Sequence, residues 1–465
     1  MRGRVESPGE GITDALARRA SGIDFATLPQ AAVEAARDLV VDHLGVSLRG
    51  WALPWTEIVR ETVLAEAAAP QATLYGGGRT SARNAALVNG TAGHALELDD
   101  THDRSLSHPG AVVIPAALAV GEALAAEGPR VIAAIVAGYE VQCRLGMVLG
   151  QALIERGMHP TATLGVFGAA AAAGRLLALD GDGMRRAFGI AASMSSGLMQ
   201  FSQDPAGTMV KRLYGGLPAE RGVLAAQLAA RGLTGPREAI EGRFGIARML
   251  AGTPGPDAWP PIPDEAFEIS RVSIKLYPCC KNFHALVEAA LRCRERRPFT
   301  PADVARVDVY GPRAMVEHHL ERRPRSTMAA QYSLPYVTAV ALLDDPAAPE
   351  LFEAGPRDRS DLLALADRVH AHVDPALQAA FPEHFAGAIR IGFADGSACE
   401  EQVQDSLGTP ARPIDRAGIR AKFVAMTRHR MSAAAQRAVF AAIDGLDRTG
   451  PIAALLAAVT AGADA

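Results

Sequence analysis

The chain has 465 residues, 49% hydrophobic and 21% charged, which is an ordinary globular composition but too long for one compact core. Its 47 basic and 51 acidic residues are well mixed and give a net charge of −4, so no basic stripe favours a nucleic acid as partner. Five cysteines do not suggest a disulfide framework, and neither a secretory signal nor an apolar stretch long enough for a bilayer is present, so we expect a cytoplasmic protein without membrane attachment.

Up to about residue 265 the apolar residues recur at three-to-four spacing, which predicts helices. Abundant Ala and only 5% aromatic residues favour closely packed helices, several of them apolar on most sides and therefore central in a bundle. The predicted helices span residues 29–46, 55–68, 83–98, 113–126, 130–150, 163–179, 183–197 and 218–231. Gly-rich and polar loops at 75–79, 180–183 and 202–216 are the expected places for function.

At 251–263 the composition changes to AGTPGPDAWPPIP, which predicts a domain boundary. Beyond it, strands are predicted at 267–277 and 304–310, with a hairpin at 388–404 that turns at Asp395-Gly396. Helices are predicted at 281–296, 325–344 and 359–373, and the segment 413–459 returns to helix. We therefore expect a mainly α protein, with an all-helical domain at 1–265 and 408–465 and an α+β lid at 266–407.

The first candidate motif is NGTAGHALELDDTH, followed by SHPG. On a helix, His94, Glu97 and Asp100 or Thr101 would share one face near the C-terminus, where acids meet the negative end of the helix dipole unless a cation such as His108 compensates. The alternatives are a solvated acidic helix end and a metal site. A hard cation would want more carboxylates, and no metalloprotease-type histidine pair is present, so we expect no metal.

Two further motifs place basic groups at helix starts. His159 precedes Pro160 at a helix N-terminus, where free backbone N–H groups can bind a carboxylate; a loop-capping imidazole is the alternative. Lys211 and Arg212, followed by glycines, can form an anion cradle, or they are an ordinary surface pair. Their spacing is not that of a P-loop, which excludes nucleotide binding there.

The motif KLYPCCKNFH runs from a predicted strand into a helix. Its adjacent cysteines lack the spacing of iron–sulfur ligands and are more typical of small side chains buried in a core. His284 is therefore the candidate catalytic residue of this motif. The motif QYSLPY, at 331–336, indicates little by itself.

In this order, the motifs resemble the MmgE/PrpD family, which includes 2-methylcitrate dehydratases, cis-aconitate decarboxylases and iminodisuccinate epimerases. The resemblance covers roughly residues 10–455 and also rests on HPTATLGVFGAAAAAGRLLAL and the Lys211 loop. It is specific for the family and much less so for the reaction. It implies an all-helical domain built from both chain ends, a smaller α+β lid, a homodimer, and no metal or organic cofactor.

Carried over position by position, the resemblance implies the catalytic residues His108, His159, Lys211 and His284. It implies the substrate-binding residues Glu97, Asp100, Thr101, Lys275 and Tyr336. Two positions depart from the family pattern: Glu97 stands where an Asp is expected, and Tyr214 stands where many relatives have His. Both positions are expected to lie near the substrate.

The family reactions share a carbanion or enolate next to a carboxylate, which needs a nearby base and positive charge. We expect Lys211 and a protonated His108 or His284 to supply the charge, His159 to move the proton, and closure of the lid to complete the site. The predicted function is a lyase that dehydrates a small hydroxy-tricarboxylate such as 2-methylcitrate. The alternatives are an iminodisuccinate-type epimerase, a cis-aconitate-type decarboxylase and a non-catalytic carboxylate-binding protein.

Overall fold

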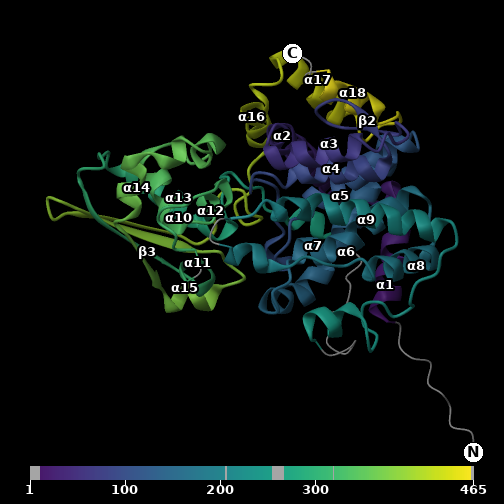
Figure 1. The fold of residues 1–465 in the computed structure, drawn as a ribbon, viewed down its shortest axis with the longest axis horizontal. Helices are drawn as coiled ribbons and strands as arrows, with labels where there is room; N and C mark the ends of the chain where they lie inside the picture. The colour runs from purple at the N-terminus through teal and green to yellow at the C-terminus, as the bar shows by residue number, and fades with distance from the viewer. Residues whose placement is uncertain (1–10, 205–206, 254–266, 318, 462–465) are drawn as a thin grey trace, which may run out of the picture.

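The computed structural model describes residues 11–204, 207–253, 267–317 and 319–461. A large body of helices lies beside a smaller part that contains the main sheet (Figure 1). This confirms the predicted mainly α class with a minor α+β part. The helices of the large body are α1 (Ile12–Gly22), α2 (Gln30–Gly50), α3 (Pro54–Leu64), α4 (Ala82–Gly93), α5 (Gly110–Ala123), α6 (Gly128–Glu155), α7 (Pro160–Leu176), α8 (Gly181–Ala192) and α9 (Leu213–Ala230).

The helical body is built around α7, which packs against α5, α6, α8 and α9. Nearly all its side chains are buried, as its Ala-rich sequence predicts. Glycine sets the closest approach: a Cβ added to Gly222 of α9 would lie 2.6 Å from the carbonyl oxygen of Val166 in α7. Among the described residues, α6 alone is long and apolar enough to cross a membrane, and 89% of its most apolar window is buried by the neighbouring helices.

The smaller part carries a four-stranded sheet in the order β4-β3-β5-β6. β3 (Val304–Gly311) pairs in parallel with β4 (Val369–Val373) and antiparallel with β5 (Gly387–Phe393), which pairs antiparallel with β6 (Ala398–Val403). The predicted strand at 304–310 and the hairpin are thus confirmed, with Gly396 at φ +83° in the turn. The helices of this part are α10 (His284–Arg296), α11 (Arg313–Val316), α12 (Thr327–Gln331), α13 (Leu334–Leu343), α14 (Ser360–Ala366) and α15 (Pro375–Ala380).

Three predictions for this part were wrong. The segment 267–277 is not a strand but a 3-10 turn at Glu268–Arg271 followed by an isolated pairing of Ser273 with Thr101, because Ile269 and Ile274 pack into the helical body. The helix expected at 325–344 breaks into α12 and α13, where Ser333 caps the second helix ahead of its Pro. The helix expected at 359–373 ends at Ala366, and its second half is β4.

The C-terminal helices α16 (Arg416–Thr427), α17 (Ala433–Asp444) and α18 (Ala453–Thr460), yellow in Figure 1, lie on the helical body, with α16 and α17 against α2. A short two-stranded sheet, β1 (Ala72–Thr73) and β2 (Arg79–Thr80), also belongs to this body.

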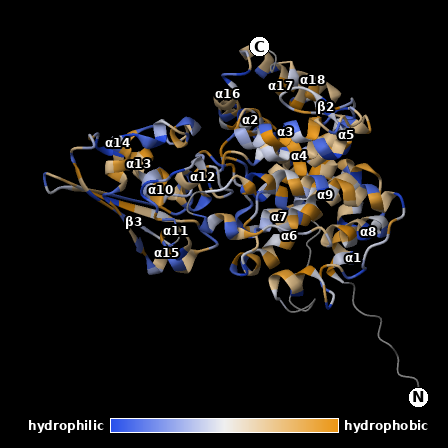
Figure 2. Ribbon diagram, in the orientation of Figure 1, coloured by the Kyte–Doolittle hydropathy of each residue, from blue (hydrophilic) through white to orange (hydrophobic). Residues whose placement is uncertain are grey.

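One buried apolar cluster joins residues 12–274 with 419–459, and another joins 279–403. Figure 2 shows the apolar residues concentrated along the packed helices. The two-domain division stays a prediction, since most of the expected boundary at 251–263 lies outside the described residues.

Candidate active site

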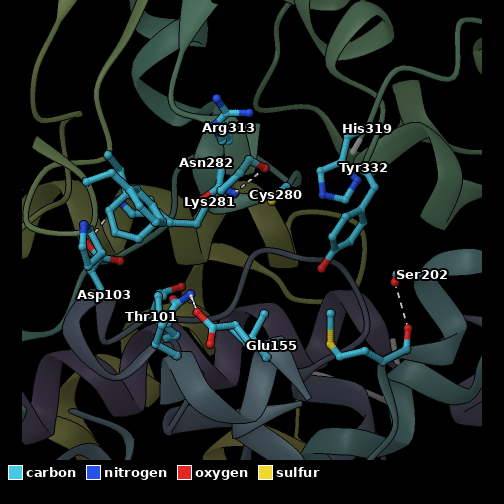
Figure 3. Close-up of a pocket in the computed structure, with 18 of the residues that line it drawn as sticks. Thr101, Asp103, Glu155, Ser202, Cys280, Lys281, Asn282, Arg313, His319 and Tyr332 are labelled. Atoms are coloured by element: carbon cyan, nitrogen blue, oxygen red, sulfur yellow. Dashed lines mark hydrogen bonds and ion pairs between the residues drawn. The ribbon is translucent and has the colours of Figure 1, made fainter. Parts of the chain in front are cut away.

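A cavity of about 1140 Å³ lies where the helical body meets the α+β part. Figure 3 shows Thr101, Asp103 and Glu155 on one side, and Lys281, Asn282 and Arg313 on the other. Its lining includes Glu97, Thr101, Asp103, His108, Arg156, Lys275, Cys280, Lys281, Asn282, Arg313, His319 and Tyr332. Polar and cationic groups from both parts of the chain therefore face one space.

The loop that carries His94, Glu97 and Thr101 begins where α4 ends, at Gly93. The predicted helix over 83–98 was therefore too long, and His94, Glu97 and Asp100 do not share a helix face. Glu97 has a φ of +55°, outside helical conformation.

Three consecutive carbonyls of this loop accept side-chain hydrogen bonds from distant segments, which fixes the loop in its non-helical shape. Leu96 O accepts from Gln331 Nε2 at 2.7 Å, Glu97 O from Lys275 Nζ at 3.1 Å, and Leu98 O from Lys422 Nζ at 2.8 Å. These donors come from residues 178 to 324 positions further along the chain, so the sequence near the loop could not reveal them.

The Glu97 carboxylate sits in a buried cluster of cations. One oxygen, Oε1, pairs with Lys211 Nζ and lies 2.7 Å from Arg212 Nη1. The other, Oε2, accepts from the Tyr332 hydroxyl at 3.1 Å and lies 3.8 Å from Lys275 Nζ. Burial alone would raise the pKa of Glu97, but Lys211, Lys275 and Arg212 hold it well below its usual range. Glu97 is therefore an anion.

A second carboxylate, Asp99, binds two imidazoles. Its Oδ2 lies 2.7 Å from His94 Nδ1 and 3.6 Å from His108 Nδ1, and these imidazoles lower the pKa of Asp99 although burial opposes them. Because an ionised carboxylate only accepts, His94 carries its proton on Nδ1. His94 Nε2 is then an acceptor for Lys211 Nζ, 3.5 Å away. Asp99, His94, Lys211 and Glu97 thus form one buried polar chain.

His108 lines the cavity with its tautomer fixed by the protein. Its Nδ1 lies 2.8 Å from the carbonyl oxygen of Asp100 and 3.2 Å from Thr101 Oγ1. A carbonyl oxygen can only accept, so Nδ1 carries the proton and Nε2 is the nitrogen left for a ligand. Burial, opposed by Asp99 and assisted by Lys275, lowers the pKa of His108 to about 3, so without a ligand the ring is neutral.

His159 stands at the start of α7, as its sequence position predicts; its side chain makes no capping hydrogen bond, and its backbone N–H donates to Gly197 O at 2.9 Å. Its ring is stacked beside that of His108, with centroids 6.4 Å apart, and 6.1 Å from that of His94. Burial and Lys211 lower its pKa well below the usual range. Tyr214 lies 5.3 Å from this ring between centroids, and its hydroxyl donates to Leu198 O at 2.7 Å.

Of the predicted site residues, Glu97, Thr101, His108 and Lys275 line the cavity, and His159 and Lys211 lie directly behind them. The structure does not bring the other three to the lining. His284 starts α10 with its ring 5.2 Å from that of Tyr277, and the Tyr336 hydroxyl donates to Leu351 O at 2.5 Å. Asp100 accepts from Gly110 N at 2.8 Å and the Tyr139 hydroxyl at 2.6 Å.

Sequence reasoning missed several polar residues of the site. Tyr332 and Gln331 lie inside the QYSLPY motif, which therefore pointed to the site, although the substrate-binding residue predicted from it is Tyr336. Arg212 stands next to Lys211 and was noted only as its partner. Lys281, 3.7 Å from Asp103 Oδ2, lies within KLYPCCKNFH. Within the described part of the chain, no three His, Cys, Asp or Glu residues are grouped to hold a metal ion.

Comparison with known proteins covers nearly the whole chain. Residues 14–258 match the MmgE/PrpD N-terminal domain, and residues 277–447 match the MmgE/PrpD C-terminal domain. A protein named cis-aconitate decarboxylase from Aspergillus terreus is 29% identical over 96% of this chain and 95% of its own length. A protein of the same name from A. terreus strain NIH 2624 is 30% identical over 86% of this chain and 86% of its own length. One from Homo sapiens is 26% identical over 89% of this chain and 87% of its own length.

Proposed function

Since the chain belongs to the MmgE/PrpD family of enzymes, we propose that it is a lyase that decarboxylates a small unsaturated tricarboxylate, cis-aconitate or a close analogue. The named relatives that align over most of the chain favour decarboxylation over the dehydration expected from the motifs alone.

The feature that carries this proposal is the His108 imidazole, with its free nitrogen available to a cavity lined by cations. When cis-aconitate loses CO₂, the bond from the methylene carbon to its carboxylate breaks and that electron pair forms a new double bond. The old double bond moves its electrons to the carbon beside a remaining carboxylate. That carbon takes one proton, so a trianion and H⁺ give CO₂ and 2-methylenesuccinate as a dianion.

His108 is suited to supply this proton. Its Nδ1–H stays bonded to the Asp100 carbonyl in both charge states, so the proton that it gains and loses is on Nε2. A bound polycarboxylate opposes the burial and the Lys275 charge that keep the ring neutral, and so raises the pKa of His108. Asp99, 3.6 Å from Nδ1, stabilises the imidazolium. His159, stacked behind it, is the second imidazole through which the proton can be replaced.

The carboxylates are assigned to groups that line the cavity. Lys275 and Lys281 place ammonium groups there, and Thr101 and Asn282 add hydrogen-bond donors. These groups stabilise the charge that moves onto the remaining carboxylate in the transition state, the role usually worth most in such reactions.

Proton NMR in D₂O tests the proposal. With cis-aconitate the wild-type protein should give 2-methylenesuccinate carrying one deuterium at the newly protonated carbon, together with CO₂. Water loss from 2-methylcitrate without CO₂ release would show the dehydratase instead, and α-hydrogen exchange in iminodisuccinate without net conversion would show the epimerase. His108→Ala, which keeps Asp99 and Lys275, should slow the growth of the product peak by ~10²–10⁴-fold.

A further inference from the structure

Three cations of this site converge on a single carboxylate. Lys211, Arg212 and Lys275 all approach Glu97, and all four side chains are at most 1% exposed. We call these three cations the Glu97 cradle. Glu97 lines the cavity, whereas neither Lys211 nor Arg212 does. The glutamate therefore stands between the cavity and two of its cations.

The cradle is held in place from both parts of the chain. Arg212 Nη2 donates to Gln331 Oε1 at 2.7 Å, and its guanidinium lies 5.4 Å from the ring centre of Trp55. Lys211 Nζ faces His94 Nε2 at 3.5 Å and the Tyr332 ring at 5.5 Å. Neither cation is placed to swing toward the cavity, because each has a second buried partner besides Glu97.

We propose that Glu97 is the resident anion of this cradle, a positioning residue that holds Lys211 against His94 and keeps Lys211 and Arg212 from binding a substrate carboxylate. The substrate is then bound by the cations that line the cavity, with Glu97 screening the two behind it. The Glu97 side chain is one methylene longer than the Asp expected at this position, and one of its oxygens contacts both Lys211 and Arg212. The assignment rests on the proposed function only where activity is measured.

Replacing Glu97 with Ala leaves a space of known size beside Lys211 and Arg212. Glu97→Ala deletes four heavy atoms, one methylene carbon and the carboxylate, which are the heavy atoms of acetate. Burial lowers the pKa of Lys211 and Glu97 is the main opposing influence, so without it the ammonium is expected to lose its proton at lower pH. Acetate, but not neutral acetamide, should refill the space.

The test combines a binding readout with a kinetic one. Acetate should raise the Tm of Glu97→Ala saturably and leave that of the wild type unchanged, while acetamide raises neither. Acetate should also restore part of the lost kcat, and Glu97→Gln should move the alkaline limb of the kcat/KM profile to lower pH. Glu122→Ala is the matched control: it removes a buried glutamate paired with Arg79, outside the cavity lining, so its kcat should stay near wild type with or without acetate.

The possible outcomes separate this proposal from the proposed reaction. If the wild type proves inactive on every tricarboxylate, acetate-dependent Tm still tests the cradle. A folded Glu97→Ala that acetate does not stabilise would overturn it, as would a Glu97→Gln variant with wild-type Tm and pH profile. Should Glu97→Ala fail to fold, the Tm and the kcat/KM pH profile of Glu97→Gln test the proposal instead.

Discussion

Replacing Asp100 with Asn should stabilise the protein at neutral pH and change its stability little near pH 4. Both carboxyl oxygens of Asp100 are buried, one accepting from Gly110 N and the other from the Tyr139 hydroxyl. Asn keeps an acceptor for the first partner and offers an amide donor to the second. Burial raises the pKa of Asp100 from 3.8 to about 7, so the carboxyl is neutral in the folded protein over a range where the unfolded chain has ionised it.

The size of the effect follows from that shift. Between pH 3.8 and about 7 the folded state holds a proton that the unfolded state has lost. Stability from Asp100 therefore falls as pH rises, by about 1.4 kcal/mol per unit, and is fully lost above the folded pKa. Asn has no proton to lose, so the advantage of Asp100→Asn should grow from near zero at pH 4 to about 4 kcal/mol at pH 8.

Urea unfolding of both proteins at pH 5, 6, 7 and 8 measures this difference. Buried imidazoles also make stability depend on pH, but they act equally on the two proteins and cancel; they are His43, His94, His108, His159 and His284. Tyr139→Phe is the control: it removes a donor to the ionised form, so it should raise the pKa of Asp100 further and extend the loss of stability to higher pH without changing its slope. Parallel curves for wild type and Asp100→Asn would refute the assignment of Asp100 as a buried structural carboxyl.

Three further predictions concern the site itself. His108→Ala or His159→Ala should lower kcat by ~10²–10⁴-fold with the Tm largely kept, and near-wild-type turnover in either would contradict the proton-transfer role. Tyr332→Phe, which removes a donor to Glu97, should lower kcat/KM, whereas Tyr336→Phe should reduce Tm but leave kcat near wild type; a reversed pattern would assign the substrate-binding role to Tyr336. Binding of the saturated tricarboxylate tricarballylate should take up protons at pH 7, because its charge raises the pKa of the neutral imidazoles; titration calorimetry in buffers of different ionisation enthalpy reads this directly.

The sequence allowed the helical body to be predicted because its signals are local. The Ala-rich periodicity of α7, the Pro after His159 and the turn at Asp395-Gly396 each depend on a few neighbouring residues. The motifs also named Glu97, Thr101, His108 and Lys275, which line the cavity, because the motifs stand in one order along the chain. The predictions that were wrong concern segments whose shape depends on contacts with residues far along the chain.

The end of α4 is the clearest failure. Residues 94–98 contain neither Pro nor Gly, and donors from Lys275, Gln331 and Lys422 hold them in the non-helical shape that follows Gly93. Tyr332 and Tyr336 show the same limit: both stand in one short motif, and only the break between α12 and α13 decides which of them reaches Glu97.

The three carbonyls at Leu96, Glu97 and Leu98 also bear on how the enzyme is made. Their donors belong to the region before α10, to α12 and to α16, the last of them 324 residues downstream of its acceptor. A nascent chain therefore lacks one of the three donors that hold residues 96–98 until Lys422 has left the ribosome and α16 has docked on α2. We therefore expect chains truncated before α16 to be inactive, even where their helical core has formed.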